Sequence, residues 1–157
     1  MAFSTGKPYV DRLTGAGSRR NLDRALRQLV AKGRPFGLLF VDVDRLKQIN
    51  DTNGHRAGDL HLRRVVRTLR DGLRGTDMLY RYGGDEFVLL LPGADRTATY
   101  QVLQLLATTS GGNFTLGIAT YPEDGAAPAA PLQAADAAMY AAKQDRRDRR
   151  SPERALS

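Results

Sequence analysis

The chain has 157 residues, of which 41% are hydrophobic, with no cysteine and a formal net charge of +7 at pH 7. This length suits one domain with its own core, and the lack of cysteine excludes a disulfide framework or a thiolate metal site. No apolar run approaches the ~20 residues that cross a bilayer, and residues 1–7 lack a signal-peptide core, so we expect a cytoplasmic chain without a membrane segment.

The positive charge favours acidic partners, either nucleic acid or free nucleotides. Its distribution favours nucleotides. The arginines of residues 63–70 alternate with leucine and valine at helical spacing, which is typical of the exposed face of an amphipathic helix. Residues 146–150 mix arginine with aspartate and are interpreted as a solvated helix end. Without a groove-reading element or a stacking platform, nucleic acid is not the expected partner.

The first predicted elements are a helix and a buried strand. Ser18 is suited to cap a helix whose apolar residues recur from Leu22 to Val30, and residues 33–35 end it. Residues 36–43 form a near-continuous apolar run, which predicts a strand buried on both faces. This strand ends in two carboxylates, Asp42 and Asp44.

The remaining elements alternate between helix and strand. A polar segment over residues 45–54 leads to an amphipathic helix over residues 58–73, and residues 78–82 and 87–91 are predicted to form a hairpin. Residues 95–108 and 132–144 are predicted helices, and residues 114–120 a strand. The order predicts an α/β fold with a mixed central sheet and flanking helices.

The turn of the hairpin is Gly83-Gly84-Asp85-Glu86. Adjacent glycines allow a positive φ and close approach of another molecule, and carboxylates offer hard oxygen ligands or a base. By itself, the pattern fits an ordinary hairpin turn with a surface acidic pair equally well.

Asp42 is predicted to lie at the carboxyl end of a central strand, where open α/β sheets bind ligands. If the hairpin is the neighbour of this strand, then Asp85 and Glu86 face Asp42, and three carboxylates repel one another unless a cation lies between them. Mg²⁺ carrying a nucleotide triphosphate is the expected occupant. The alternative for Asp42 alone is a helix cap.

Several motifs, in order, resemble the GGDEF domain of diguanylate cyclases, which condense two GTP into cyclic di-GMP and two pyrophosphates. They lie at residues 11–15, 42–51, 54–55, 58–59, 81–87, 121–125 and 135–143. The resemblance implies a nucleotide-cyclase-like, palm-like domain over residues 11–150, preceded by an extension over residues 1–10 and followed by a tail over residues 151–157.

The resemblance also implies a catalytic metal site. Mg²⁺ or Mn²⁺ would be bound by Asp42, Asp85, Glu86 and the carbonyl of Val43. Asp85 would accept a proton, Glu86 would add charge at the metal, and Lys47 would steady charge on the phosphates. The alternatives are metal ligation without proton transfer for the two acids and an exposed helix lysine for Lys47.

The substrate-binding residues that the resemblance implies come from four segments. Asn50 and Asp59 would read guanine, with His55 near the nucleotide. The phosphates would face the backbone of Arg45 and Leu46 and the side chains of Lys143 and Arg147. Gly83 and Gly84 would make room for GTP. Helix caps and a basic helix end are the alternatives for these polar residues.

An Arg-x-x-Asp motif at Arg74 and Asp77 stands at the offset where the family has an inhibitory site for the product. The alternative is a helix-end arginine followed by a strand-opening aspartate. Departures from the family include Asn53 for an aromatic residue, Leu46 for phenylalanine, and Arg146 and Asp148 for the glycine and asparagine that usually flank position 147.

Catalysis in the family aligns two GTP molecules on two facing domains, so we expect a homodimer. We expect that the sensor or dimerisation module that usually brings about this dimer is absent from this chain. The competing hypothesis is a catalytically silent module that binds cyclic di-GMP or GTP as a sensor.

Overall fold

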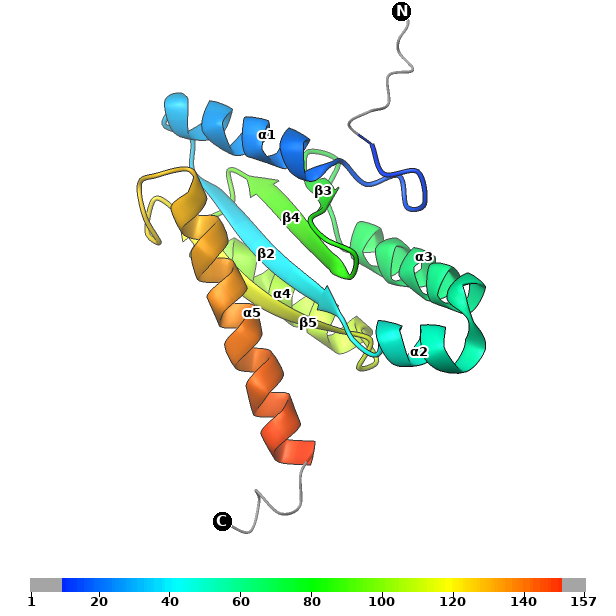
Figure 1. Cartoon of the computed structure of the whole chain (residues 1–157). Helices are drawn as coiled ribbons and strands as arrows, with labels where there is room; N and C mark the ends of the chain where they lie inside the picture. Colours follow the sequence, from blue (N-terminus) through cyan, green and yellow to red (C-terminus); the bar gives the residue numbers. More distant parts are fainter. Residues whose placement is uncertain (1–9, 151–157) are drawn as a thin grey trace, which may run out of the picture.

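The structure, a computed structural model, describes residues 10–150. Its elements are α1 (Arg19–Ala31), β2 (Phe36–Val43), α2 (Leu46–Asn53), α3 (His55–Asp71), β3 (Met78–Arg81), β4 (Glu86–Pro92), α4 (Arg96–Thr109), β5 (Phe114–Tyr121) and α5 (Ala129–Arg150) (Figure 1). The predicted tail over residues 151–157 and the predicted extension, apart from Val10, lie outside the described residues. No helix of the described part has the length and apolar character of a membrane span.

The four strands form one sheet in the order β3-β4-β2-β5. The predicted α/β class with flanking helices is confirmed. The neighbours in this sheet all pair antiparallel, where we expected a mixed sheet. The helical connections explain the difference, because they join β2 to β3 and β4 to β5, and another strand separates the members of each pair in the sheet.

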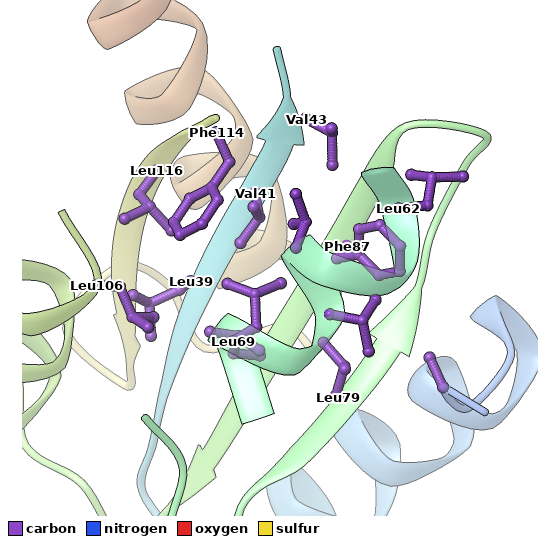
Figure 2. Packing of buried hydrophobic residues seen from close by; sticks show 14 of the residues in the cluster. Leu39, Val41, Val43, Leu62, Leu69, Leu79, Phe87, Leu106, Phe114 and Leu116 are labelled. Atoms are coloured by element: carbon purple, nitrogen blue, oxygen red, sulfur yellow. The ribbon is translucent and has the colours of Figure 1, made fainter. Parts of the chain in front are cut away.

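Alternation along β2 divides the core between the two faces of the sheet. Leu39, Val41 and Val43 pack with residues of α3 and α4 (Figure 2), whereas Leu38 and Phe40 pack with residues of α1 and α5. Every residue of β2 is buried, as the apolar run predicts. The strand is therefore a fixed platform for the carboxylates at its end.

Helices α1 and α4 begin where a short polar side chain, Ser18 or Asp95, accepts from a free backbone N–H group. Ser18 Oγ accepts from the Asn21 N–H at 3.1 Å, which confirms the predicted cap of α1.

The polar segment that we predicted over residues 45–54 is largely a helix, α2, and α3 begins at His55 rather than near residue 58. Because α2 has no buried residue, it carries no apolar stripe to reveal it.

Candidate functional site

The ends of β2 and β4 bring the predicted metal-binding residues to one edge of the sheet. Asp42 pairs with Glu86 in the strand register, and the Val43 N–H donates to the Asp85 carbonyl at 2.8 Å. The hairpin is thus the sheet neighbour of β2, as the sequence analysis required. The backbone places the four residues next to one another.

Asp42 is a buried carboxylate with one free acceptor. Its Oδ2 accepts from Lys143 Nζ, while no hydrogen-bond partner of its Oδ1 exists among the described residues. Burial raises the pKa of Asp42; the hydrogen bond from Lys143 opposes this rise, and the charge of Asp85 adds to it. A buried acceptor without a partner, beside a second acid, fits a cation.

The donor chemistry fits Mg²⁺ or Mn²⁺, which prefer carboxylate and carbonyl oxygens. Within residues 10–149, however, no three His, Cys, Asp or Glu side chains converge as a metal cluster. A cation at Asp42 and Asp85 would therefore draw further oxygens from the Val43 carbonyl or from a bound phosphate.

Glu86 lies on the α1 and α5 side of the sheet edge. Burial raises the pKa of Glu86, and the charges of Asp85, Asp42 and Asp136 raise it further, against the opposing charge of Arg19. Its Oε1 lies 2.6 Å from the position that a Cβ on Gly83 would take. The absence of a side chain at Gly83 therefore leaves room for the Glu86 carboxylate.

A pocket of about 450 Å³ opens on the other side of Asp85 and is called the Asp85 pocket below. It gathers most of the residues that the sequence analysis assigned to substrate. Its lining comprises Leu46, Lys47, Asn50, Asp51, His55, Gly58, Asp59, Leu62, Arg81, Gly84 and Asp85. These side chains come from α2, the first turns of α3 and the β3–β4 hairpin, so three separate segments build one pocket.

Asn50 packs closely against Gly58 of α3. Its Oδ1 is buried without a partner in the described part of the chain, and a Cβ on Gly58 would stand 1.7 Å from it. The absence of a side chain at Gly58 is therefore what allows the amide to lie in the pocket wall. An amide in this position can answer the donors and acceptors of a base.

The start of α2 offers backbone donors beside the pocket. Arg45 adopts a left-handed conformation, with φ 65° and ψ 13°, and no side chain caps the helix. The first N–H groups of a helix are free for an anion, and Lys47 adds a cation in the first turn. This arrangement suits a phosphate group.

Arg81 holds the hairpin turn in place and was missed by the sequence analysis. Its guanidinium donates to the carbonyls of Gly84 at 2.7 Å and Gly83 at 3.3 Å, and to Asp11 Oδ1 at 3.1 Å. Burial acts to raise the pKa of Asp11, but hydrogen bonds from Thr14 and the charge of Arg81 hold it below the ordinary value. The available signal was the position of Arg81 at the start of the motif over residues 81–87.

Gly83 and Gly84 do not use the conformation that adjacent glycines allow, since neither has a positive φ. Around Gly84, no atom among the described residues lies within 4 Å of where a Cβ would stand. Gly84 alone of the pair lines the Asp85 pocket.

The two basic residues predicted near the phosphates fall in different places. Lys143 pairs with Asp42, whereas Arg147 is exposed and is not part of the pocket lining. The interpretation of residues 146–150 as a solvated helix end is wrong for Arg146, which points inward and pairs with Asp44 at 2.6 Å. A sequence alone does not show which residue of a basic run faces inward.

Arg74 and Asp77 lie at the opposite end of β4 from Asp85. Arg74 donates to the Pro92 carbonyl at 3.3 Å and to Asp77 Oδ1 at 2.8 Å, and its backbone N–H donates to Asp77 Oδ2 at 2.8 Å. The Asp77 side chain is 0% exposed and that of Arg74 56%. Only the arginine therefore presents polar atoms at the surface.

Comparisons with known proteins identify the family of this chain. A model of the diguanylate cyclase GGDEF domain matches residues 8–149. Diguanylate cyclase TpbB of Pseudomonas aeruginosa, strain UCBPP-PA14, is 42% identical over 142 residues, which cover 82% of this chain and 33% of that protein. The chain thus spans about a third of the length of this relative.

Solved structures give the same result. The GGDEF domain of TpbB (YfiN) from Pseudomonas aeruginosa has a TM-score of 0.75 at 37% identity, covering 87% of this chain and 89% of that one. The GGDEF domain of DgcB from Caulobacter crescentus, solved in complex with c-di-GMP, has a TM-score of 0.75 at 26% identity, covering 88% and 91%. Because the family model spans nearly the whole described chain, and the folds superimpose over most of their length, this chain belongs to the diguanylate cyclase GGDEF family.

Proposed function

We propose that the domain is a Mg²⁺-dependent diguanylate cyclase that condenses two GTP into cyclic di-GMP and two pyrophosphates. The observation that carries this proposal is the position of Asp42 and Asp85 beside a pocket whose wall contains the unpartnered Asn50 amide oxygen. A metal-binding edge next to a base-reading pocket is what a nucleotide-triphosphate substrate requires.

The pocket residues divide by chemistry. Asn50 and Asp59 read the guanine edge, with His55 beside the nucleotide. Lys47 and the free N–H groups of Arg45 and Leu46 at the start of α2 hold the phosphates. Lys143 and Arg147, which lie outside the pocket lining, reach the phosphates from α5.

Asp42, Asp85 and the Val43 carbonyl, with Glu86 adding charge, would hold Mg²⁺ or Mn²⁺. When bound, the ion would neutralise the triphosphate and favour the attacking 3′-oxygen as an alkoxide. An Asp85 carboxylate oxygen accepts the proton of the 3′-hydroxyl.

One domain supplies one such pocket, and cyclic di-GMP has two phosphodiester bonds. We therefore propose a homodimer in which each 3′-oxygen meets the α-phosphate held by the other domain. A sensor or dimerisation module elsewhere in the full protein would bring the two cytoplasmic domains together, and the chain covers only 33% of its relative TpbB.

A second candidate function is a silent module that binds GTP or cyclic di-GMP without turnover. One observation favours it: Lys143 already neutralises Asp42, where the first proposal needs a cation. The two functions differ in whether a metal ion and GTP displace this lysine.

Incubation of concentrated protein with GTP and MgCl₂, followed by nucleotide separation, distinguishes the two. Formation of cyclic di-GMP and pyrophosphate, dependent on Mg²⁺ and rising with the square of protein concentration at low concentration, supports the cyclase. Tight binding of either nucleotide without product supports the silent module.

Replacement of Arg74 by alanine tests the product site at the far end of β4. The exposed guanidinium is the group that can bind a guanine edge or a phosphate there, so we expect its loss to weaken product inhibition by about tenfold or more, with initial synthesis unchanged. The measurement is the initial rate at increasing cyclic di-GMP. Arg67→Ala, which removes the same charge from the exposed face of α3, is the matched control and should remain inhibited by cyclic di-GMP. If Arg74→Ala is inhibited as strongly as the wild type, the product site is removed from the proposal.

Replacement of Gly84 by alanine tests the pocket wall. A methyl group at Gly84 meets no atom of the described protein, so we expect the free energy of unfolding to change by less than about 0.5 kcal/mol. Because the methyl enters the Asp85 pocket, we expect GTP affinity to fall by about tenfold, as for an intrusive group in a close-fitting site. Urea unfolding and GTP titration measure the two effects, and unchanged affinity would place the nucleotide elsewhere.

A further inference from the structure

Two cations of α5 face two carboxylates at the end of β2. Lys143 and Arg146 are one helical turn apart, and Asp42 and Asp44 are separated by one residue. Lys143 Nζ donates to Asp42 Oδ2, and Arg146 Nη1 donates to Asp44 Oδ2 at 2.6 Å. The last turns of α5 are thus joined to the strand that carries the proposed metal ligand.

The two ion pairs differ in how firmly they are held. Among the described residues, Lys143 makes one hydrogen bond, at the end of a flexible stem. The guanidinium of Arg146 also donates to Thr115 Oγ1 at 2.6 Å, to the Phe114 carbonyl at 3.3 Å and to the Gly112 carbonyl at 3.4 Å. Arg146 is therefore the fixed cation of the two, and Lys143 is the one free to exchange partners.

Asp44 also makes hydrogen bonds to β5 and to the loop before it. Thr115 Oγ1 donates to Asp44 Oδ2 at 2.9 Å, and the Asp44 backbone N–H donates to the Asn113 carbonyl at 2.8 Å. The side chain of Asp44 is 11% exposed and that of Arg146 29%. One guanidinium thus connects α5, the end of β2 and the loop before β5.

We infer that Arg146 is a positioning residue for the nucleotide site: its anchorage on Asp44 holds the end of α5 so that Lys143 stays within reach of both Asp42 and the substrate phosphates. The inference rests on the proposed function, which assigns Lys143 to the phosphates. If a cation were bound at Asp42 in place of Lys143, the anchored helix would keep the Lys143 ammonium beside the triphosphate.

If Arg146 only stabilised the fold, its loss would have a different effect on ligand binding. Loss of a purely structural contact would lower the stability of the domain and weaken the binding of all ligands of the pocket alike. Loss of a positioning residue acts through Lys143, so it weakens a ligand with a triphosphate and spares one without.

The test measures binding of GTP and of guanosine, each in the presence of Mg²⁺, to the full chain and its variants. For Arg146→Ala we expect GTP affinity to fall by about tenfold, the loss of one charge-assisted hydrogen bond, with guanosine affinity unchanged. Lys143→Ala should show the same loss, and the double variant should be no worse than Lys143→Ala, because both substitutions remove one interaction. Arg149→Ala is the control, since Arg149 pairs on the helix surface with Asp145 at 3.2 Å and its side chain is 80% exposed.

Arg146→Lys keeps the charge but loses the multiple donors, so its GTP affinity should lie between those of wild type and Arg146→Ala. This variant carries the test if Arg146→Ala does not fold. Equal losses for GTP and guanosine, or losses of Arg146→Ala and Lys143→Ala that add, would overturn the inference alone. A wild-type chain that binds no GTP would overturn the proposed function and the inference with it.

Discussion

Substitution of Asp85 by asparagine is expected to reduce cyclic di-GMP synthesis by about a thousandfold, the range of a lost general base combined with a weakened metal site. Asp85 is the acid that both lines the Asp85 pocket and adjoins Asp42 through the strand pairing. Its backbone carbonyl, which accepts from Val43, is unchanged by the substitution. The fold should therefore persist while the charge is lost.

The measurement combines product formation with thermal unfolding. Asp23→Asn is the matched control, because it removes one charge from the surface of α1, where Asp23 pairs with Arg27 and both side chains are 65% exposed. We expect this control to synthesise cyclic di-GMP at the wild-type rate. An Asp85→Asn variant with wild-type turnover would show that the proposed base and metal ligand lie elsewhere.

The sequence was most informative where burial is continuous. The run over residues 36–43 predicted β2 to the residue, because a strand covered on both faces needs apolar side chains throughout. The next two predicted strands form a hairpin whose turn carries Asp85. The prediction that Asp42 and Asp85 lie close together needed one assumption, that this hairpin pairs with β2. The strand register confirms that pairing.

The sequence was least informative where polar side chains choose their partners in three dimensions. Helix α2 buries none of its residues, so its sequence resembles that of a loop. Arg146 stands in a run of basic and acidic residues, and only the packing of α5 on β5 and β2 decides that it reaches Asp44 while Arg147 remains exposed. Such choices depend on helix rotation, which composition does not encode.

The same distinction applies to Arg74 and Asp77. The family resemblance implied a product site at these two residues. The structure pairs the two side chains with each other and buries that of Asp77 completely. The spacing that matches the family motif also suits a local ion pair across a tight turn. A product site there, as we propose, would use the exposed edge of the arginine.

Replacement of Gly58 by alanine is expected to separate stability from recognition. In the interior of α3, alanine is favoured over glycine by about 0.5–1 kcal/mol, so helix propensity alone would stabilise the domain. The new Cβ would stand 1.7 Å from Asn50 Oδ1 and 2.8 Å from Asn50 Cγ, so the amide must rotate away from its present position. Because that amide is the proposed guanine reader, we expect GTP affinity to fall by about tenfold or more and the preference for GTP over ATP to decrease.

Titration with GTP and with ATP, beside urea unfolding, measures the two effects. Asn50→Ala is the matched variant: it should lose the same preference for GTP, and the double variant should be no worse than Asn50→Ala, because one amide accounts for both losses. If Gly58→Ala retains the wild-type preference while Asn50→Ala loses it, the amide reads guanine from a position other than the one that Gly58 leaves open. If neither variant changes the preference, guanine recognition does not depend on this wall of the pocket, and Asp59 becomes the residue to test.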